Sequence, residues 1–273
     1  MNTNPGAAAP RLHVLVVGAT GSIGRLVVEE ALKAGHVVHA LVRDVRAASD
    51  LRAEAVRIQG DLTDAASLET ALRGVDAIVF THGSPGNSKA EVEAVDYGGV
   101  RNVLLALRGR PARIALMTAI GVTNRTSEYN RSTGVHDWKR RAERLVRASG
   151  LPYTIVRPGW FDYNARDQHR LVFLQGDRRH AGDPSDGVVA RSQIAQVLVA
   201  SLTSDAALRK TFELVAERGP APAALQEMFG ALEADATGSI DACRDLPNLP
   251  PADEPPAVRK DLERIAAQSA ATR

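Results

Sequence analysis

Short apolar runs alternate with helical patterns over the first 160 or so residues of the chain. The run from Leu12 to Val17 is almost entirely apolar, rich in β-branched residues and followed at once by glycine, which is typical of a buried parallel strand. Apolar side chains then recur at every fourth position over residues 22–34, and Gly35 follows. This spacing predicts an amphipathic helix that ends at the glycine.

The same alternation of strand and helix patterns continues along the chain. Further strands are predicted at 37–42, 56–59, 77–80, 113–117 and 153–156, with helices at 64–73, 89–108 and 136–149. Strands that alternate with helices form right-handed βαβ units, which assemble into a parallel sheet with helices on both faces. The pattern therefore predicts an α/β fold of the Rossmann type, with a doubly wound parallel sheet.

Composition divides the chain into three parts. Residues 1–10 are small and polar and are expected to form a flexible tail, whereas residues 11–218 are expected to form the α/β domain. Within that domain residues 159–190 are polar and broken by glycines, so we expect loops that border a substrate site. Residues 219–273 are expected to form a small extension that either wraps the core or contacts a partner. Outside these loops the predicted elements are a helix at 191–202, a strand at 211–216, a helix at 222–234, a proline-rich stretch at 246–256 and a short charged helix.

Composition and charge exclude several classes of protein. Of the 273 residues 44% are hydrophobic and 24% are charged, and the net charge of +2 gives no global attraction to nucleic acid or to a membrane surface. The single cysteine, Cys243, permits no intrachain disulfide, the first ten residues lack the pattern of a secretory signal, and no apolar run is long enough to cross a bilayer. We therefore expect a cytoplasmic protein that acts on a small molecule, without metal, nucleic acid or membrane, and homo-oligomer formation stays open.

A glycine-rich turn joins the first strand to the first helix and reads GATGSIG over residues 18–24. Glycines in such a turn allow a tight bend, a close approach of the backbone to a diphosphate and close packing of the helix on the sheet. The amino end of the helix adds free N–H groups and the positive end of the helix dipole. The turn therefore predicts a dinucleotide site at Gly18, Thr20, Gly21, Ser22, Ile23 and Gly24.

Four stretches of the chain together resemble the short-chain dehydrogenase/reductase superfamily: GATGSIG at 18–24, ALVRD at 40–44, GDLTD at 60–64 and ASGLPYTIVRPG at 148–159. The glycine spacing and the last stretch are similar to the atypical members, in particular the NmrA-like and biliverdin reductase B (flavin reductase) branch. The resemblance covers about residues 11–217. It implies a Rossmann domain that binds a nicotinamide dinucleotide.

Arg43 favours NADP(H) over NAD(H). A ribose 2′-hydroxyl is usually bound by a carboxylate after the second strand, whereas a 2′-phosphate needs a cation. Arg43 directly follows the predicted strand 37–42, where the resemblance places the 2′-phosphate ligand, and its planar guanidinium suits a phosphate. The next residue, Asp44, keeps NAD(H) open, and an arginine in a solvated loop is the structural alternative.

The resemblance implies further cofactor contacts at the ends of later strands. Asp61 and Leu62 are expected to flank the adenine, and the backbone at Thr81, His82 and Gly83 is expected to lie against the adenosine ribose. The remaining expected contacts are Thr118, the ribose ligand Lys139, and a segment that covers the nicotinamide, consisting of Pro158, Gly159, Trp160 and Phe161.

The usual proton donor of the superfamily is missing. Most members carry Tyr-x-x-x-Lys, in which the lysine lowers the tyrosine pKa, but here Val135 stands four residues before Lys139. His136 shares a helix face with Lys139 and titrates near neutrality, so the candidate catalytic residues are Lys139, His136 and Thr118. The alternative for His136 is an exposed side chain on a strongly basic helix that also carries Arg140, Arg141, Arg144 and Arg147.

The sequence favours an NADP(H)-dependent oxidoreductase that reduces a flat, quinone- or flavin-like acceptor. Trp160, Phe161 and Tyr163 form an aromatic cluster suited to stacking such a molecule. The cofactor carries the hydride, so the missing tyrosine does not exclude redox chemistry. Two alternatives stay open: a non-catalytic NADP(H)-binding sensor of the NmrA-like type, and an enzyme like the nucleotide-sugar epimerases and dehydratases.

Overall fold

The computed structural model describes residues 10–86 and 88–270, so nearly all of the predicted tail lies outside the described residues. A parallel sheet forms the centre of the molecule, with the strand order β3-β2-β1-β4-β5-β6-β10. Its strands are β1 (His13–Val17), β2 (Val37–Val42), β3 (Val56–Gln59), β4 (Ala77–Phe80), β5 (Arg113–Met117), β6 (Tyr153–Pro158) and β10 (Lys210–Glu217). The order reverses between β1 and β4, which is the topology of a doubly wound Rossmann sheet and confirms the predicted fold class.

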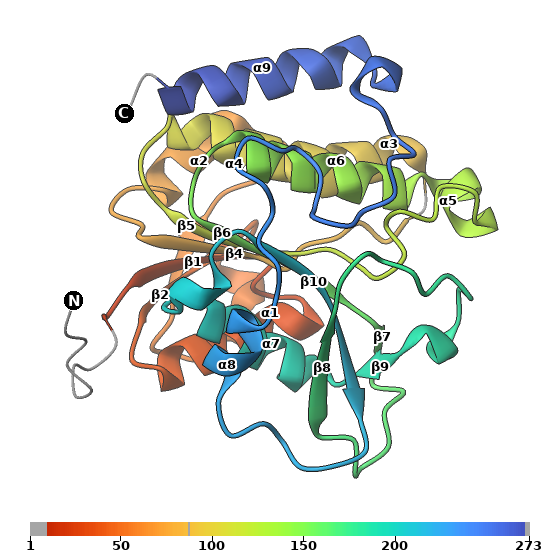
Figure 1. The fold of residues 1–273 in the computed structure, drawn as a ribbon. Helices are drawn as coiled ribbons and strands as arrows, with labels where there is room; N and C mark the ends of the chain where they lie inside the picture. Colours follow the sequence, from red (N-terminus) through yellow and green to blue (C-terminus); the bar gives the residue numbers. More distant parts are fainter. Residues whose placement is uncertain (1–9, 87, 271–273) are drawn as a thin grey trace, which may run out of the picture.

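Helices cover both faces of the sheet (Figure 1). On one face lie α1 (Ser22–Lys33) and α7 (Arg191–Ser201), and on the other lie α2 (Ala65–Ala71), α4 (Gly98–Leu107) and α6 (Val135–Ala148). Successive residues of each strand alternate between the two apolar layers: Val14 and Val16 belong to one, whereas Leu15 and Val17 belong to the other. The sheet is thus buried on both sides, as its continuous apolar strands predict.

Three segments differ from the predicted elements. The predicted helix 89–108 is divided into α3 (Lys89–Val92), a π-helical turn (Glu93–Tyr97) and α4, and the unpredicted α5 (Glu128–Thr133) precedes α6. Residues 159–190, expected to be loops, contain β8 (Arg170–Leu174) and the short strands β7 (Trp160–Phe161) and β9 (Val188–Val189). β8 pairs antiparallel with β10, a strand far along the chain, so local spacing alone could not reveal it.

The C-terminal residues fold back across the molecule (Figure 1). α8 (Leu225–Gly230) is shorter than the predicted helix 222–234, and residues 231–255 then pass to the opposite face of the sheet. There α9 (Pro256–Ala270) lies over α4 and α6, with Val258 and Ile265 buried in the same apolar layer. The extension therefore wraps the core, which is one of its two predicted roles.

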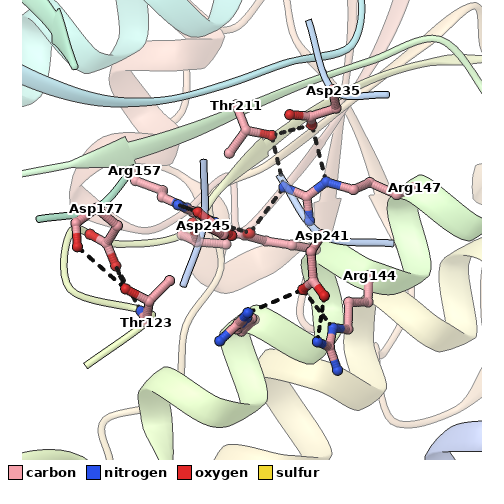
Figure 2. A network of polar contacts seen from close by, with 12 residues as sticks. Thr123, Arg144, Arg147, Arg157, Asp177, Thr211, Asp235, Asp241 and Asp245 are labelled. Carbon is pink, nitrogen blue, oxygen red and sulfur yellow. Dashed lines mark hydrogen bonds and ion pairs between the residues drawn. The ribbon is translucent and has the colours of Figure 1, made fainter. Parts of the chain in front are cut away.

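Residues 235–254 of this extension cover a set of buried arginines, as Figure 2 shows for several of them. The arginine cluster consists of Arg140, Arg141, Arg144 and Arg147 of α6 and Arg157 of β6. Arg144 donates to Asp241 at 2.7 Å and to Glu254 at 2.6 Å, and Arg157 donates to both carboxylate oxygens of Asp245 at 2.7 and 2.8 Å. The arginines of this basic helix are therefore buried, because acidic residues of the extension cover this face of α6.

Candidate functional site

A cavity of about 940 Å³ opens at the carboxyl edge of the sheet, where the strand order reverses between β1 and β4. Open α/β sheets bind their ligands at this position, and the volume is that of a cofactor site. Most residues singled out in the sequence line this cavity: Gly18, Thr20, Gly21, Ser22, Ile23, Arg43, Asp61, Leu62, Thr81, His82, Gly83, Thr118, His136, Lys139 and Phe161. Four others do not line it, namely Gly24, Pro158, Gly159 and Trp160.

The glycine turn is packed between α1 and the end of β4. Gly18 has a positive φ of 83°, and a side chain there would bring a Cβ within 2.7 Å of the His82 backbone nitrogen. A Cβ at Gly24 would lie 2.0 Å from the Gly18 carbonyl oxygen, so Gly24 lets α1 pack on the turn rather than face the cavity. Gly21 stands at the N-cap position just before α1 and has no side chain that could cap the helix. The N–H groups of the first turn of α1 are therefore left for an anion.

Arg43 is exposed at the end of β2 and lines the cavity. Its guanidinium makes no hydrogen bond or ion pair with the described part of the chain, so it is free to bind a phosphate. The competing carboxylate, Asp44, does not line the cavity, and one of its oxygens accepts the Arg46 backbone N–H at 2.8 Å. The donor set at this corner therefore fits a 2′-phosphate better than a 2′-hydroxyl.

Asp61 closes the turn that follows β3. Its Oδ1 accepts both the backbone N–H and the hydroxyl of Thr63 at 2.8 Å, and these hydrogen bonds hold the pKa of Asp61 below its usual value. The carboxylate is therefore ionised near neutral pH and keeps its second oxygen for a ligand. Asp61 is therefore a turn residue that also faces the cavity.

His82 presents a neutral ring with one unused acceptor. Burial lowers the pKa of His82 to about 4, and its Nε2 lies 3.1 Å from the carbonyl oxygen of Val95. If Nε2 carries the proton and donates to that oxygen, Nδ1 is an acceptor. This Nδ1 is buried and has no partner among the described residues, so a donor from a bound molecule, such as a ribose hydroxyl, would satisfy it.

Lys139 is held by a carboxylate that the sequence did not identify. Its Nζ lies 2.6 Å from Oδ1 of Asp96, which sits in the π-helical turn and accepts the Ser84 backbone N–H through its other oxygen at 3.0 Å. Burial alone would raise the pKa of Asp96, but the charge and hydrogen bond of Lys139 outweigh it and hold the pKa below its usual value. The ammonium therefore enters the cavity as half of an ion pair.

Thr118 donates its one hydroxyl proton to another side chain of the protein. The hydroxyl donates to Oε1 of Glu143 at 2.8 Å, and that buried carboxylate is in turn bound by Arg157 at 2.7 Å. A threonine hydroxyl has one proton to donate, so toward the cavity Thr118 can only accept a hydrogen bond. It can therefore receive an amide or hydroxyl proton from a ligand but cannot donate to a substrate oxygen.

The position of the missing tyrosine is apolar. Val135 lines the cavity and is buried, and the adjacent His136 lies close to the ring of Tyr129, with 5.4 Å between ring centroids. Burial lowers the pKa of His136, and its Nδ1 is buried without a partner within the described residues. His136 is therefore a neutral imidazole rather than a ready acid, and its predicted exposure on a basic helix is only partial.

Of the aromatic cluster predicted from the sequence, Phe161 lines the cavity, whereas Trp160 and Tyr163 do not. Trp160 packs edge-on against Tyr163 with 6.2 Å between ring centroids. A Cβ at Gly159 would meet the Gly187 carbonyl oxygen at 2.4 Å, so Gly159 serves the contact between two loops. A second aromatic wall comes from Tyr129 of α5.

Several lining residues escaped the sequence analysis as cofactor contacts. They are Leu41, Val42, Gly60, Thr63, Ser84, Pro85, Glu91, Val95, Met117, Ala119 and Tyr129. Most directly follow or end the strands whose neighbours were identified, so proximity to those strand ends could have found them; Tyr129 lies on a short helix that carried no pattern. Within the described residues there is no cluster of three or more potential metal ligands of the His, Cys, Asp or Glu type. None of the described helices is both long and apolar enough to cross a membrane.

Comparison with known proteins finds relatives and solved structures that are similar to this chain. Photosystem II assembly factor Ycf39 from Synechocystis sp. is 27% identical over 210 residues, covering 76% of this chain and 63% of that protein, so the chain spans less than two thirds of its relative. A solved putative NAD-dependent epimerase/dehydratase from Bacillus halodurans gives a TM-score of 0.65 at 23% identity, over 80% of this chain and 99% of that one. A putative NADH-flavin reductase from Streptococcus pneumoniae gives 0.59 at 19% identity, over 76% and 100%.

These two solved structures share the fold of the chain, and the family follows from the match to a family profile. Residues 18–205, more than half of the chain, match the profile of the NAD(P)H-binding family. This stretch contains the glycine turn, Arg43, Lys139 and every strand of the parallel sheet except β1, which ends just before it, and β10, which follows it. The chain therefore belongs to the NAD(P)H-binding family.

Proposed function

We propose that the protein is an NADP(H)-dependent reductase of a flat organic acceptor and works without a dedicated protein proton donor. The observation that carries the proposal is the apolar Val135 at the usual tyrosine position, beside a Thr118 hydroxyl whose proton goes to Glu143. When bound, the cofactor would supply a hydride. The residues of the chain bind and orient the two reactants, and they exclude water from the cavity.

The preference for NADP(H) rests on the corner at Arg43. Its free guanidinium favours the 2′-phosphate, since Asp44 does not line the cavity, and the uncapped end of α1 favours the diphosphate. Thr118 and Lys139 line the opposite part of the cavity, where they would meet the nicotinamide half.

The preference for a flat acceptor rests on the chemistry that the site lacks. A carbonyl substrate needs a proton or a hydrogen-bond donor as its oxygen becomes negative, and general acid catalysis of this kind supplies roughly 10²–10⁴-fold in rate. Reduced quinones and flavins delocalise that charge over a ring system, so water can protonate them. The rings of Phe161 and Tyr129 offer such acceptors an aromatic wall.

NADPH oxidation measured against quinones, flavins and aldehydes tests this function. We expect turnover with quinones or flavins and little with aldehydes, and His136→Gln is expected to cost far less than the roughly 10²–10⁴-fold of a lost general acid. Phe161→Leu is expected to impair turnover more than its neighbour Trp160→Leu, because Phe161 alone of the two lines the cavity. Rapid aldehyde reduction that His136→Gln abolishes would replace this proposal by one with a histidine proton donor.

A non-catalytic NADP(H) sensor is the second candidate. It is favoured by the hydrogen-bonded path from the cavity to the C-terminal extension, which runs from Thr118 through Glu143 and Arg157 to Asp245. Tight NADPH binding without turnover of any acceptor would select it. An epimerase or dehydratase is disfavoured, because those enzymes rely on the missing tyrosine. A cytoplasmic location and a homo-oligomeric state stay predictions.

A further inference from the structure

Arg191, the first residue of α7, reaches the glycine turn of the dinucleotide site. α7 and α1 pack side by side under the sheet (Figure 1), and both begin near its carboxyl edge. Nε of Arg191 donates to the hydroxyl of Ser22, the first residue of α1, at 3.1 Å. A cation from a distant part of the chain is thus attached to the anion-binding end of α1.

Asp162, in the loop after β7, fixes the direction of this arginine. Asp162 pairs with the Arg191 guanidinium and also accepts the Arg191 backbone N–H at 3.1 Å. Asp162 has a positive φ of 57°, a conformation that is strained for most residues, and its own N–H donates to the Val189 carbonyl oxygen at 3.0 Å. The guanidinium lies over the Phe161 ring, with 5.3 Å from Cζ to the ring centroid.

The guanidinium keeps donors for a further partner. Nε and Nη1 are engaged by Ser22 and Asp162, whereas Nη2 makes no hydrogen bond within the described residues, and 34% of the side chain is exposed. Its two cavity-lining neighbours, Ser22 and Phe161, come from the glycine turn and the acceptor side respectively. The group therefore stands at the border of the cavity, between the two halves of the proposed cofactor.

We propose that Arg191 binds the diphosphate of the dinucleotide, together with the N–H groups at the start of α1. The inference rests on the proposed NADP(H) function and extends it to a residue outside the glycine motif. An arginine fork suits a phosphate, and the positive end of the α1 dipole favours the same anion. Since Asp162 and Phe161 hold the same guanidinium, diphosphate binding would also fix the loop that carries the aromatic wall of the acceptor side.

Calorimetric titration with a series of nucleotides tests the assignment. NADPH and ADP-ribose contain the diphosphate, whereas 2′-AMP contains only the adenosine with its 2′-phosphate. Arg191→Gln is expected to weaken NADPH and ADP-ribose binding about 10- to 100-fold, as for a lost charged hydrogen bond, and to leave 2′-AMP unchanged. Arg43→Gln is expected to weaken NADPH and 2′-AMP and to leave NADH unchanged. Arg218 is an exposed arginine paired with Asp167, so Arg218→Gln is the control. It is expected to leave the binding of NADPH, ADP-ribose and 2′-AMP unchanged.

Asp162→Asn separates a binding role from a structural one. Asparagine tolerates the positive φ, so the loop keeps its conformation, while Arg191 loses the carboxylate that offsets its charge. If Arg191 binds the diphosphate, this variant binds NADPH at least as tightly as the parent. If Arg191 only braces the loop, Asp162→Asn weakens NADPH as Arg191→Gln does, and the inference is overturned. Thermal unfolding checks both variants, and Asp162→Asn alone decides the matter if Arg191→Gln does not fold.

Two further outcomes are distinct from each other. A folded Arg191→Gln protein with parental affinity for NADPH and ADP-ribose overturns the role of Arg191 and leaves the proposed function intact. A parent protein that binds none of the nucleotides overturns the proposed function itself.

Discussion

Two polar side chains that would face the nicotinamide half of the cofactor already have partners within the protein. Lys139 pairs with Asp96, and Thr118 donates its proton to Glu143. Among the groups that remain for a ligand are backbone N–H groups of α1, the Arg43 guanidinium and the free acceptor of His82. Such a site offers many contacts to a nucleotide and few protons to a substrate.

Glu213 makes the stability of the protein fall as the pH rises through neutrality. This residue of β10 is buried, and burial raises its pKa to about 7. Arg157 lies 3.4 Å away and opposes this shift. Its effect is limited because two other carboxylates lie closer to the same arginine. A folded-state pKa above the unfolded value means that folding takes up a proton between about pH 4.5 and 7. The favourable contribution is complete at low pH and is lost as the pH rises through the folded-state pKa.

We therefore expect the unfolding free energy of Glu213→Gln, measured relative to that of the parent, to increase by about 2–3 kcal/mol between pH 5 and pH 8. Urea denaturation of both proteins at the two pH values measures this difference. Histidines with lowered pKa titrate over the same range in both proteins, so they cancel in the comparison. A difference that does not change with pH would show that Glu213 is ionised throughout.

At the scale of helices and strands, the glycine turn is determined by local contacts, whereas the environment of α6 is determined by residues far away along the chain. The turn is specified locally, since Gly18, Gly21 and Gly24 meet one another within seven residues. It could be predicted from the sequence for that reason. Arg43 and Val135 could be predicted as well, because Arg43 directly follows a predicted strand and Val135 stands four residues before Lys139. The arginine cluster on α6 and β6 is instead neutralised largely by carboxylates 88 to 113 residues away along the chain, so the sequence of α6 alone does not reveal these partners. Asp96 and Glu143 escaped for the same reason: each meets its cavity partner only through the fold.

Gly21→Val is expected to abolish NADPH binding without unfolding the protein. Gly21 has an ordinary φ of −71°, and a Cβ there would lie 3.2 Å from the Gly18 carbonyl oxygen, a contact that small shifts relieve. The added methyl groups would occupy the space that the diphosphate needs. Gly24→Ala is the contrasting variant, because its Cβ would lie 2.0 Å from that same oxygen and must displace α1. Calorimetry and thermal unfolding together distinguish the two, and a folded Gly21→Val protein with parental affinity contradicts the expectation.

Glu254→Gln is expected to destabilise the protein by about 3–5 kcal/mol. Its buried carboxylate accepts from Arg141 and from Arg144, each at 2.6 Å, and a neutral amide leaves two buried guanidinium groups undercompensated. Glu263→Gln on α9 is the matched control, since Glu263 is exposed, and it is expected to change the stability by less than about 0.5 kcal/mol. Equal midpoints in urea for the two variants would mean that the cluster contributes no net stability.

At the scale of the whole molecule, the extension is part of the folded body. The Rossmann topology and the cavity at its switch point follow from the alternation of strands and helices, and they could be predicted. The path of residues 231–270 could not be predicted. A polar segment of it contacts the charged side chains of α6, and α9 contributes an apolar stripe to the core, so no single pattern describes it. Tyr97, for example, donates its hydroxyl to Asp261 at 2.8 Å, a contact that no local pattern announces.

Deletion of residues 231–273 is expected to prevent cooperative folding, because it removes Asp235, Asp241, Asp245 and Glu254 while the arginine cluster stays behind. Deletion of residues 256–273 is the milder comparison. It removes α9 with its buried Val258 and Ile265 but keeps all four carboxylates, so we expect a folded protein of lower stability. Circular dichroism with thermal unfolding measures both, and a cooperative transition in the longer deletion would refute the requirement for the carboxylates.

The sequence separation within the arginine cluster also sets an order of events during synthesis. Arg141 and Arg144 leave the ribosome 97 to 113 residues before the acidic groups that neutralise them. At about 5–20 residues per second, translation needs roughly 5–20 s to cover that distance. Throughout this interval the nascent Rossmann core carries guanidinium groups that cannot be buried without their carboxylates. Docking of residues 235–254 onto α6 is therefore expected to follow the synthesis of the Rossmann core, and until then the guanidinium groups on this face of α6 lack the carboxylates of that segment.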